Sequence, residues 1–195
     1  MNDPLILQVG VVLVVFLCLA ILVVILHIFQ DPARKFFKAL ALKYKGKAGL
    51  LADSMRGKFR DIDFSVHMAG GGKSSPALLV FRLCRPASFM LRVYKQGARG
   101  PLGEISIVRQ ARINDPFFDS QFIIYSDRPM MAVNFLNPSA KNTLKELFAQ
   151  GFESFLMNKQ GLWLGKPAGP LEQDLGPEKV EWALNKLLSL SGGVA

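Results

Sequence analysis

An uninterrupted apolar segment near the start of the chain dominates its pattern of hydrophobic and polar positions. Between residues 5 and 29 no residue is charged, and the only polar side chains are Gln8 and His27, near the two ends. A helix of this length reaches about 37 Å, enough to cross a hydrocarbon core of about 30 Å with some tilt. We therefore predict a transmembrane helix over residues 5–29, preceded by a short tail of residues 1–4. A cleaved signal peptide is disfavoured, because the segment lacks a basic start and a cleavage site.

The residues after the apolar segment follow a helical period. Asp31 and Pro32 suit the start of a helix and Gly46 suits its end, which predicts a helix over residues 32–45. One arc of this helix is apolar and another is basic. The predicted membrane-surface residues are Arg34, Lys35, Phe36, Phe37, Lys38, Lys43 and Lys45.

Two roles for this basic helix remain open. In the first, it lies along an anionic inner leaflet with its phenyl rings at the acyl boundary. In the second, its apolar arc packs on the following domain, and its lysines only orient the span. Beyond it, Ala48, Leu50, Leu51 and Met55 are spaced for one or two more helical turns, ending at Gly57.

Beyond residue 60 the pattern changes to alternation and to short apolar runs, which predict strands. Residues 62–68 alternate cleanly, and residues 77–83 are apolar on both sides except for Arg82, as in a central strand. Further strands are predicted at residues 89–94, 105–108, 122–125, 152–157 and 162–164. Short connections between them favour antiparallel pairing.

Two regions return to helical spacing, near residues 129–149 and 177–190. The predicted fold class is therefore α+β, with a mostly antiparallel sheet of five to seven strands covered on one face by helices. The predicted organisation is the transmembrane helix, a basic juxtamembrane segment at residues 30–60, and one α+β domain at residues 61–195.

Positive charge is concentrated behind the predicted span. Residues 30–60 carry nine Lys and Arg against two Asp, whereas residues 61–195 carry fifteen basic and twelve acidic residues. Lys and Arg beside a span stay on the cytoplasmic side. We therefore predict a single-pass protein with its N-terminus outside and its domain in the cytoplasm. A nucleic-acid partner is not expected, because the basic residues gather next to lipid rather than within the domain.

Residues with chemical reactivity are sparse. Cys18 and Cys84 form neither a disulfide framework nor a metal-binding spacing. His67 is a lone histidine on the polar side of its strand. We therefore predict no catalytic, metal-binding or cofactor-binding residue, and no cofactor.

The most distinctive stretch beyond the span lies at residues 112–136. Asn114, Asp115 and Pro116 predict a turn, and at least one of Phe117 and Phe118 is expected to plug the core. Ser126 or Asp127 can cap a helix that begins near Pro129. The residues of this signature are Asp115, Pro116, Phe118, Asp119, Phe122 and Asp127.

This signature resembles a pattern in uncharacterised bacterial membrane-anchored proteins, in which one or two N-terminal spans precede a small α+β domain. The resemblance covers about residues 100–150, and this chain has Asn114 where those proteins often have Gly. It implies a bacterial origin, and with the predicted span it implies the bacterial cytoplasmic (inner) membrane. It implies no activity.

The acidic residues of the signature leave two functional hypotheses. Asp115 and Asp119 could form a carboxylate pair for acid–base chemistry, or they could close a turn and cap backbone N–H groups. The leading hypothesis is a membrane-tethered cytoplasmic module, not an enzyme, that binds a protein partner or the inner-leaflet surface. The alternative is an enzyme of unknown type that uses carboxylates near Asp115 and Asp119.

Overall fold

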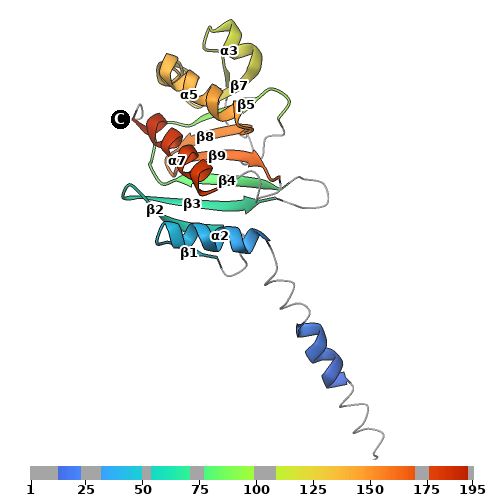
Figure 1. Cartoon of the computed structure of the whole chain (residues 1–195). Coiled ribbons are helices and arrows are strands. Elements are labelled where there is room, and N and C mark those ends of the chain that lie inside the picture. The colour runs from blue at the N-terminus through green and yellow to red at the C-terminus, as the bar shows by residue number, and fades with distance from the viewer. Residues whose placement is uncertain are drawn as a thin grey trace, which may run out of the picture.

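A nine-stranded antiparallel sheet with helices on one face forms the protein (Figure 1). The computed structural model describes residues 13–22, 32–49, 54–70, 77–98, 109–169 and 176–192. Among the described residues beyond residue 31, the helices are α2 Pro32–Lys43, α3 Pro116–Gln121, α4 Pro129–Phe135, α5 Pro138–Ala149 and α7 Pro177–Ser191. The strands are β1 Lys47–Ala48, β2 Ser54–Phe59, β3 Ile62–Ala69, β4 Leu78–Leu83, β5 Leu91–Lys95, β6 Arg109–Ala111, β7 Phe122–Ser126, β8 Ser154–Asn158 and β9 Gly161–Pro167.

The strand order confirms the predicted α+β class and antiparallel pairing. The order is β1-β2-β3-β4-β9-β8-β5-β7-β6, and every neighbouring pair is antiparallel. The hairpin of β8 and β9 lies in the middle of the sheet, where it joins the early meander of β1 to β4 to the later strands. The β8–β9 hairpin, the last pair of strands in the chain, therefore connects the two halves of the sheet.

The predicted number of five to seven strands was too low, because β1, β2 and β6 were not foreseen. β1 and β6 have two and three residues, too few to display a period. β2 replaces the expected helical turns ending at Gly57, because Met55 and Phe59 are buried on one side and Arg56 and Lys58 are exposed on the other. The predicted strand at residues 105–108 lies outside the described residues.

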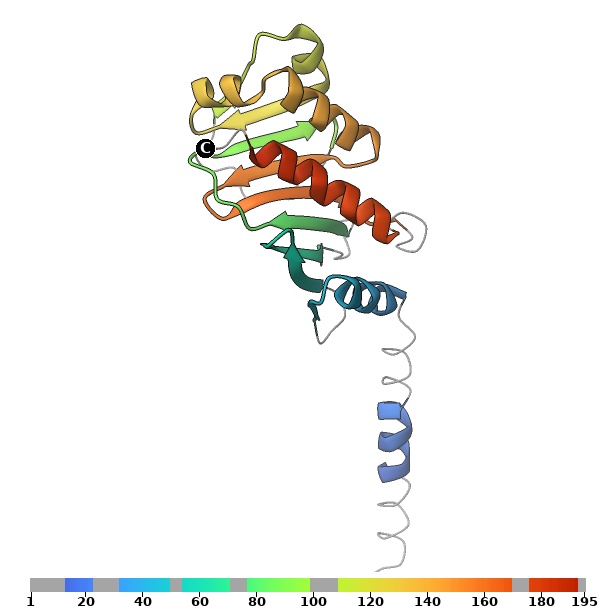
Figure 2. The ribbon, with the colours of Figure 1, turned by 60° about the vertical axis from the view of Figure 1, so that its left-hand side comes forward.

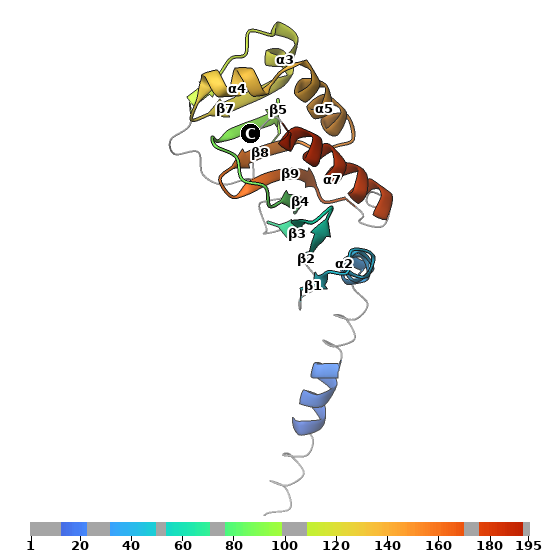
Figure 3. The same cartoon turned by 90° about the vertical axis from the view of Figure 1, so that its left-hand side faces the viewer.

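One row of side chains shows how the sheet carries the core. Directly paired residues share a face of a sheet. The row on the helix-covered face runs through Ala48, Met55, Val66, Phe81, Leu164, Phe155, Val93, Ile124 and Ala111. These residues share one core with buried residues of all five helices, and Figures 2 and 3 show α2, α5 and α7 along that side.

The helix α2 is part of this core. Phe37 is fully buried and Leu40 nearly so, both belong to the same core as Met55 of β2, and α2 contacts β2. An exposed ion pair of 3.0 Å joins Lys43 to Glu181 of α7. The apolar arc of α2 therefore packs on the domain, as the second of the two alternatives predicted.

The helix α2 ends two residues earlier than predicted, in a Schellman motif. Lys45 adopts the left-handed conformation with a φ of 48°, and Gly46 donates its N–H to the carbonyl of Ala41 at 2.8 Å. The expected boundary between residues 60 and 61 falls in the β2–β3 turn, where Arg60 and Asp61 both have positive φ. The core thus continues across that boundary.

The predicted transmembrane helix lies outside the described residues except for residues 13–22. This segment is helical and its side chains are exposed throughout. Within the described part of the chain, none of the helices combines the length and the apolar character that a membrane crossing requires.

Candidate functional site

The carboxylates of Asp115 and Asp119 accept hydrogen bonds from backbone N–H groups, and Asp115 also pairs with a lysine. Oδ1 of Asp115 accepts the N–H of Phe118 at 3.1 Å and thereby caps α3, while its Oδ2 lies 2.6 Å from Nζ of Lys141 on α5. The hydrogen bonds from Lys141 and from the Phe118 N–H lower the pKa of Asp115. Oδ1 of Asp119 accepts the N–H of Ile113 at 3.3 Å.

The remaining signature residues are also structural. Phe118 is fully buried, and its ring lies 4.5 Å from that of Phe122, which stacks on Phe148 of α5. Asp127 accepts the N–H of Met90 at 2.8 Å, so it ties β7 to the start of β5. Neither Ser126 nor Asp127 caps α4, contrary to prediction, because α4 has no side-chain cap hydrogen bond.

The geometry explains what these residue types do at this spacing. Pro116 occupies the first turn of α3, which is only six residues long and needs the Asp115 cap to begin. Phe118 and Phe122 then fix that short helix to β7. The two carboxylates considered for acid–base chemistry are engaged with backbone N–H groups and Lys141, as the structural alternative expected.

The residues predicted for a membrane surface separate into two groups. Phe37 is buried in the core and Phe36 is packed partly against it. The charged members, Arg34, Lys35, Lys38, Lys43 and Lys45, are exposed or partly exposed along α2 and just after it. The two phenyl rings therefore serve the domain, and the basic side chains remain at the surface.

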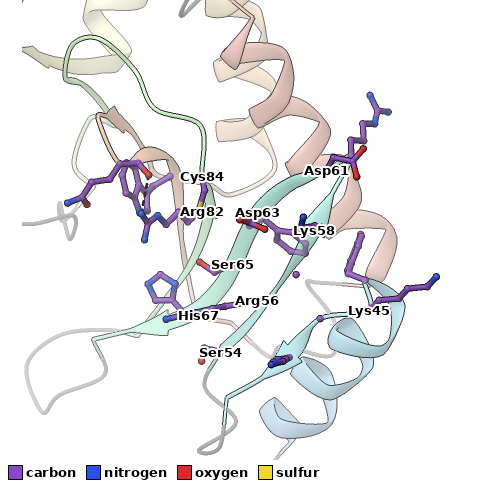
Figure 4. A pocket seen from close by; sticks show the side chains of 18 of the residues that line it. Lys45, Ser54, Arg56, Lys58, Asp61, Asp63, Ser65, His67, Arg82 and Cys84 are labelled. Carbon is purple, nitrogen blue, oxygen red and sulfur yellow. Dashed lines mark hydrogen bonds between the residues drawn. The ribbon is translucent and has the colours of Figure 1, made fainter.

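A basic row crosses the face of the sheet that the helices leave uncovered. Direct pairing places Lys47, Arg56, Ser65, Arg82 and Trp163 side by side on β1, β2, β3, β4 and β9. At about 4.8 Å between strands this row spans roughly 19 Å. Figure 4 shows Arg56, Ser65 and Arg82 in succession across β2, β3 and β4.

This row lies in an open groove of about 1250 Å³, which we call the basic groove. Its walls include residues 44–46 just after α2, the strands β2, β3 and β4, and Gln160 and Trp163 of the β8–β9 hairpin. Its charged residues are Lys45, Lys47, Arg56, Lys58, Arg60 and Arg82 against Asp61 and Asp63. With His67 neutral, these eight residues give the groove a net charge of +4.

One arginine of the basic groove, Arg82 on β4, is held by two contacts. The guanidinium carbon of Arg82 lies 5.1 Å from the centre of the Trp163 ring, and its Nη2 donates to the carbonyl of Gln160 at 3.0 Å. Trp163 itself is buried, in a small apolar cluster with Val80 and Leu156 on the same face of the sheet. A guanidinium held over an aromatic ring and by one hydrogen bond has restricted rotation, and an arginine can bind a carboxylate or phosphate through charge-assisted hydrogen bonds.

Sequence reasoning missed the basic groove for two reasons. The Lys and Arg of residues 30–60 were treated as one signal for membrane orientation, although Arg56 and Lys58 alternate with buried residues of a strand. His67 lines the basic groove, but in the sequence it is a lone histidine on the polar side of a strand, which indicates no site. The pairing that brings Arg82 beside Ser65 and Arg56 joins distant parts of the chain, so no local pattern reports it.

The described residues show no metal-binding geometry. Within the described ranges, no group of three or more His, Cys, Asp and Glu side chains is placed to hold a metal ion. Cys84 lines the basic groove and is exposed.

Comparison with known proteins gives one likeness in fold. No protein-family model and no curated protein matches the sequence. The crystal structure of the mycobacterial trehalose monomycolate transport factor A, TtfA, is similar with a TM-score of 0.54. The match covers 83% of this chain and 97% of that chain at 10% sequence identity, so the likeness concerns the fold alone.

Proposed function

We propose that this protein is a membrane-tethered, non-catalytic binding module of the bacterial cytoplasmic membrane, and that it binds a segment of a partner protein in the basic groove. The observation that carries the proposal is the basic groove itself. It is a hollow of about 1250 Å³ on the one sheet face that the described helices leave open, and six of its residues are Lys or Arg. A second hollow, lined by Gly151, Lys179 and Trp182 among others, has a volume of about 320 Å³.

The membrane tether is supported by the apolar segment at residues 5–29. Its described part, residues 13–22, exposes an apolar surface all round, with Phe16 at 69% and Leu13 at 66% exposed. A helix that is apolar on every side needs either a protein core or a membrane around it. The excess of Lys and Arg behind the segment favours a cytoplasmic domain.

The likeness to TtfA supports a role beside a membrane transport system. TtfA is named as a transport factor, and this chain shares its fold over most of both chains. The predicted span has polar side chains only near its ends, at Gln8 and His27, which disfavours a transport path through the span itself. We therefore propose that the protein assists a membrane machine as an accessory module.

The enzyme alternative is disfavoured by the engagement of its proposed carboxylates. Asp115 caps α3 and pairs with Lys141, and Asp119 accepts a backbone N–H. A general acid or base needs a carboxylate that can reach a substrate proton. These two carboxylates instead hold the chain in place.

The proposed function is tested by photo-crosslinking in cells that make the full chain. A photoreactive residue replaces Ser65, which lies in the middle of the basic groove. The matched control places the same residue at Ser139, an exposed position on α5 on the opposite face of the sheet. We expect a discrete light-dependent adduct with a membrane-associated protein from position 65 and not from position 139.

Two results would overturn the proposal. One is the absence of any protein adduct from position 65. The other is the same set of adducts from both positions, which would indicate collision rather than binding.

The orientation of the domain across the membrane is tested separately by labelling Cys84 with an impermeant maleimide in a Cys18→Ser variant. We expect labelling only after the membrane is opened, because Cys84 is exposed on the domain.

A further inference from the structure

We infer that the occupant of the basic groove is an extended, acidic segment of the partner protein, with carboxylate side chains on alternate residues. This inference rests on the proposed function and adds the chemistry of the partner. It comes from three features of the basic groove: its charge, the spacing of its basic side chains along β2, and the orientation of Arg82.

Charge complementarity selects an anionic occupant. The basic groove carries six Lys and Arg against two Asp, and the exposed side chains of Arg56 and Lys58 stand on its floor. A concave surface lined by one sign of charge concentrates its field and attracts ligands of the opposite sign. An acidic segment is therefore drawn to this face rather than to the helix-covered face.

The spacing of the basic side chains matches an extended polypeptide. Arg56 and Lys58 are two residues apart on β2, so their side chains leave the same face about 6.8 Å apart. An extended peptide presents its alternate side chains at the same interval. Carboxylates at alternate positions can therefore meet Arg56 and Lys58 in turn when the peptide runs along β2.

Arg82 gives the basic groove a second point of recognition on β4. Its guanidinium is oriented by the ring of Trp163 and by the carbonyl of Gln160. Ser65, a hydroxyl donor, lies between Arg82 and Arg56 in the same cross-strand row. A guanidinium whose rotation is already restricted loses less conformational entropy when it binds a carboxylate.

The shape and the mixed charge of the basic groove favour a polypeptide over a lipid surface. A bilayer is flat on this scale and contacts protruding groups, whereas the basic groove is a hollow. Asp61 and Asp63 also line it, and they repel a uniformly anionic leaflet. A peptide accommodates both acids, because it can carry an amide or a basic side chain opposite each of them.

The test measures binding of a defined acidic peptide to the full chain in nanodiscs of neutral phosphatidylcholine. The probe is a fluorescent peptide of alternating Glu and Ser, and its control is a peptide of alternating Gln and Ser. The groove variant carries Arg56→Glu with Lys58→Glu, both at exposed positions. The matched variant carries Lys35→Glu with Lys38→Glu on α2, which changes the net charge equally but lies outside the groove.

We expect the Glu–Ser peptide to bind and the Gln–Ser peptide to bind at least about tenfold more weakly. The groove variant should weaken binding of the Glu–Ser peptide by about tenfold, and the matched variant by less than about twofold. Equal weakening in both variants would overturn the inference, because it would indicate attraction by net charge alone. Equal binding of the two peptides, or no binding of either, would overturn it as well.

A lipid occupant is distinguished by a second arm with phosphatidylglycerol vesicles. If the groove variant alone loses capture by these vesicles, and the Glu–Ser peptide does not compete with them, the occupant is lipid and the inference is wrong.

The proposed function and the acidic chemistry of the partner can fail separately. An adduct from position 65 without groove-dependent peptide binding rejects only the acidic chemistry, whereas no adduct from position 65 rejects the proposed function.

Discussion

Lys141 on α5 donates a hydrogen bond of 2.6 Å to the carboxylate of Asp115, the residue that caps α3. Both side chains are partly buried, with 20% of the Lys141 side chain and 26% of the Asp115 side chain exposed. One aspartate thus joins two helices that are separated by a strand and by α4. The first consequence is a dependence of stability on pH.

Asp115→Asn should lower the melting temperature at neutral pH but not in acid. Asn retains the cap to the Phe118 N–H and loses the ion pair with Lys141. The pKa of Asp115 is lowered below its ordinary value of 3.8, first by Lys141. A group with a lowered pKa stabilises the folded state above its ordinary pKa, and this contribution is lost as pH falls through the lowered value. We expect the variant to melt at a lower temperature at pH 7, and the difference to shrink as the pH falls below 3.8 through the lowered pKa of Asp115.

The measurement is a set of thermal melts of both proteins between pH 7 and pH 2.5, followed by circular dichroism. A temperature difference that stays constant across this range would contradict the prediction, because the effect would then not come from the charge of Asp115.

Leu40→Ala and Leu42→Ala should differ sharply although they lie on the same helix. Leu40 is 1% exposed within the core and Leu42 is 82% exposed. Truncating a buried leucine costs about 2–5 kcal/mol of stability, and an exposed one less than about 0.5 kcal/mol. Urea unfolding of the full chain in detergent, followed by tryptophan fluorescence, measures both. Similar small effects would contradict the assignment of α2 to the domain.

Gly46→Ala should destabilise the junction between α2 and β2. A Cβ at this position would lie 2.0 Å from the carbonyl oxygen of Arg56, so the end of α2 must move away from the strand. We expect a loss of about 1–3 kcal/mol in urea unfolding. Gly192→Ala is the matched control, because its Cβ meets only an ordinary contact of 3.6 Å with Ser189. An equal effect of both changes would show that the close approach does not matter.

The sequence predicted the elements whose signal is local. Alternation between Ile62 and Met68 predicted β3, and helical spacing near residues 129–149 predicted the region that forms α4 and α5. Each of these signals is contained within a few neighbouring residues. The α+β class follows from their order.

The sequence did not predict the basic groove, because its residues meet only through pairing. Arg56, Ser65 and Arg82 become neighbours when β2, β3 and β4 align in register, which depends on the whole sheet. Ser126 and Asp127 failed as caps for a related reason. Their oxygens accept from the backbone of Arg128 and of Met90, and Met90 lies in a different part of the chain.

Two adjacent phenylalanines give the sharpest test of the signature. Phe118 is fully buried against Phe122, whereas Phe117 is 58% exposed and lies with its ring 4.3 Å from Nζ of Lys145. Phe118→Ala should therefore cost about 3–5 kcal/mol and detach α3 from β7. Phe117→Ala should cost less than about 1 kcal/mol, the value of an exposed cation–π contact.

Urea unfolding of the two variants measures the difference, and hydrogen exchange of the backbone amides of β7 locates it. Loss of protection confined to α3 and β7 in Phe118→Ala is the expected pattern, because these two elements share the ring of Phe118. If Phe117→Ala proved equally destabilising, the assignment of Phe118 as the ring that fixes α3 to the core, with Phe117 exposed, would be wrong.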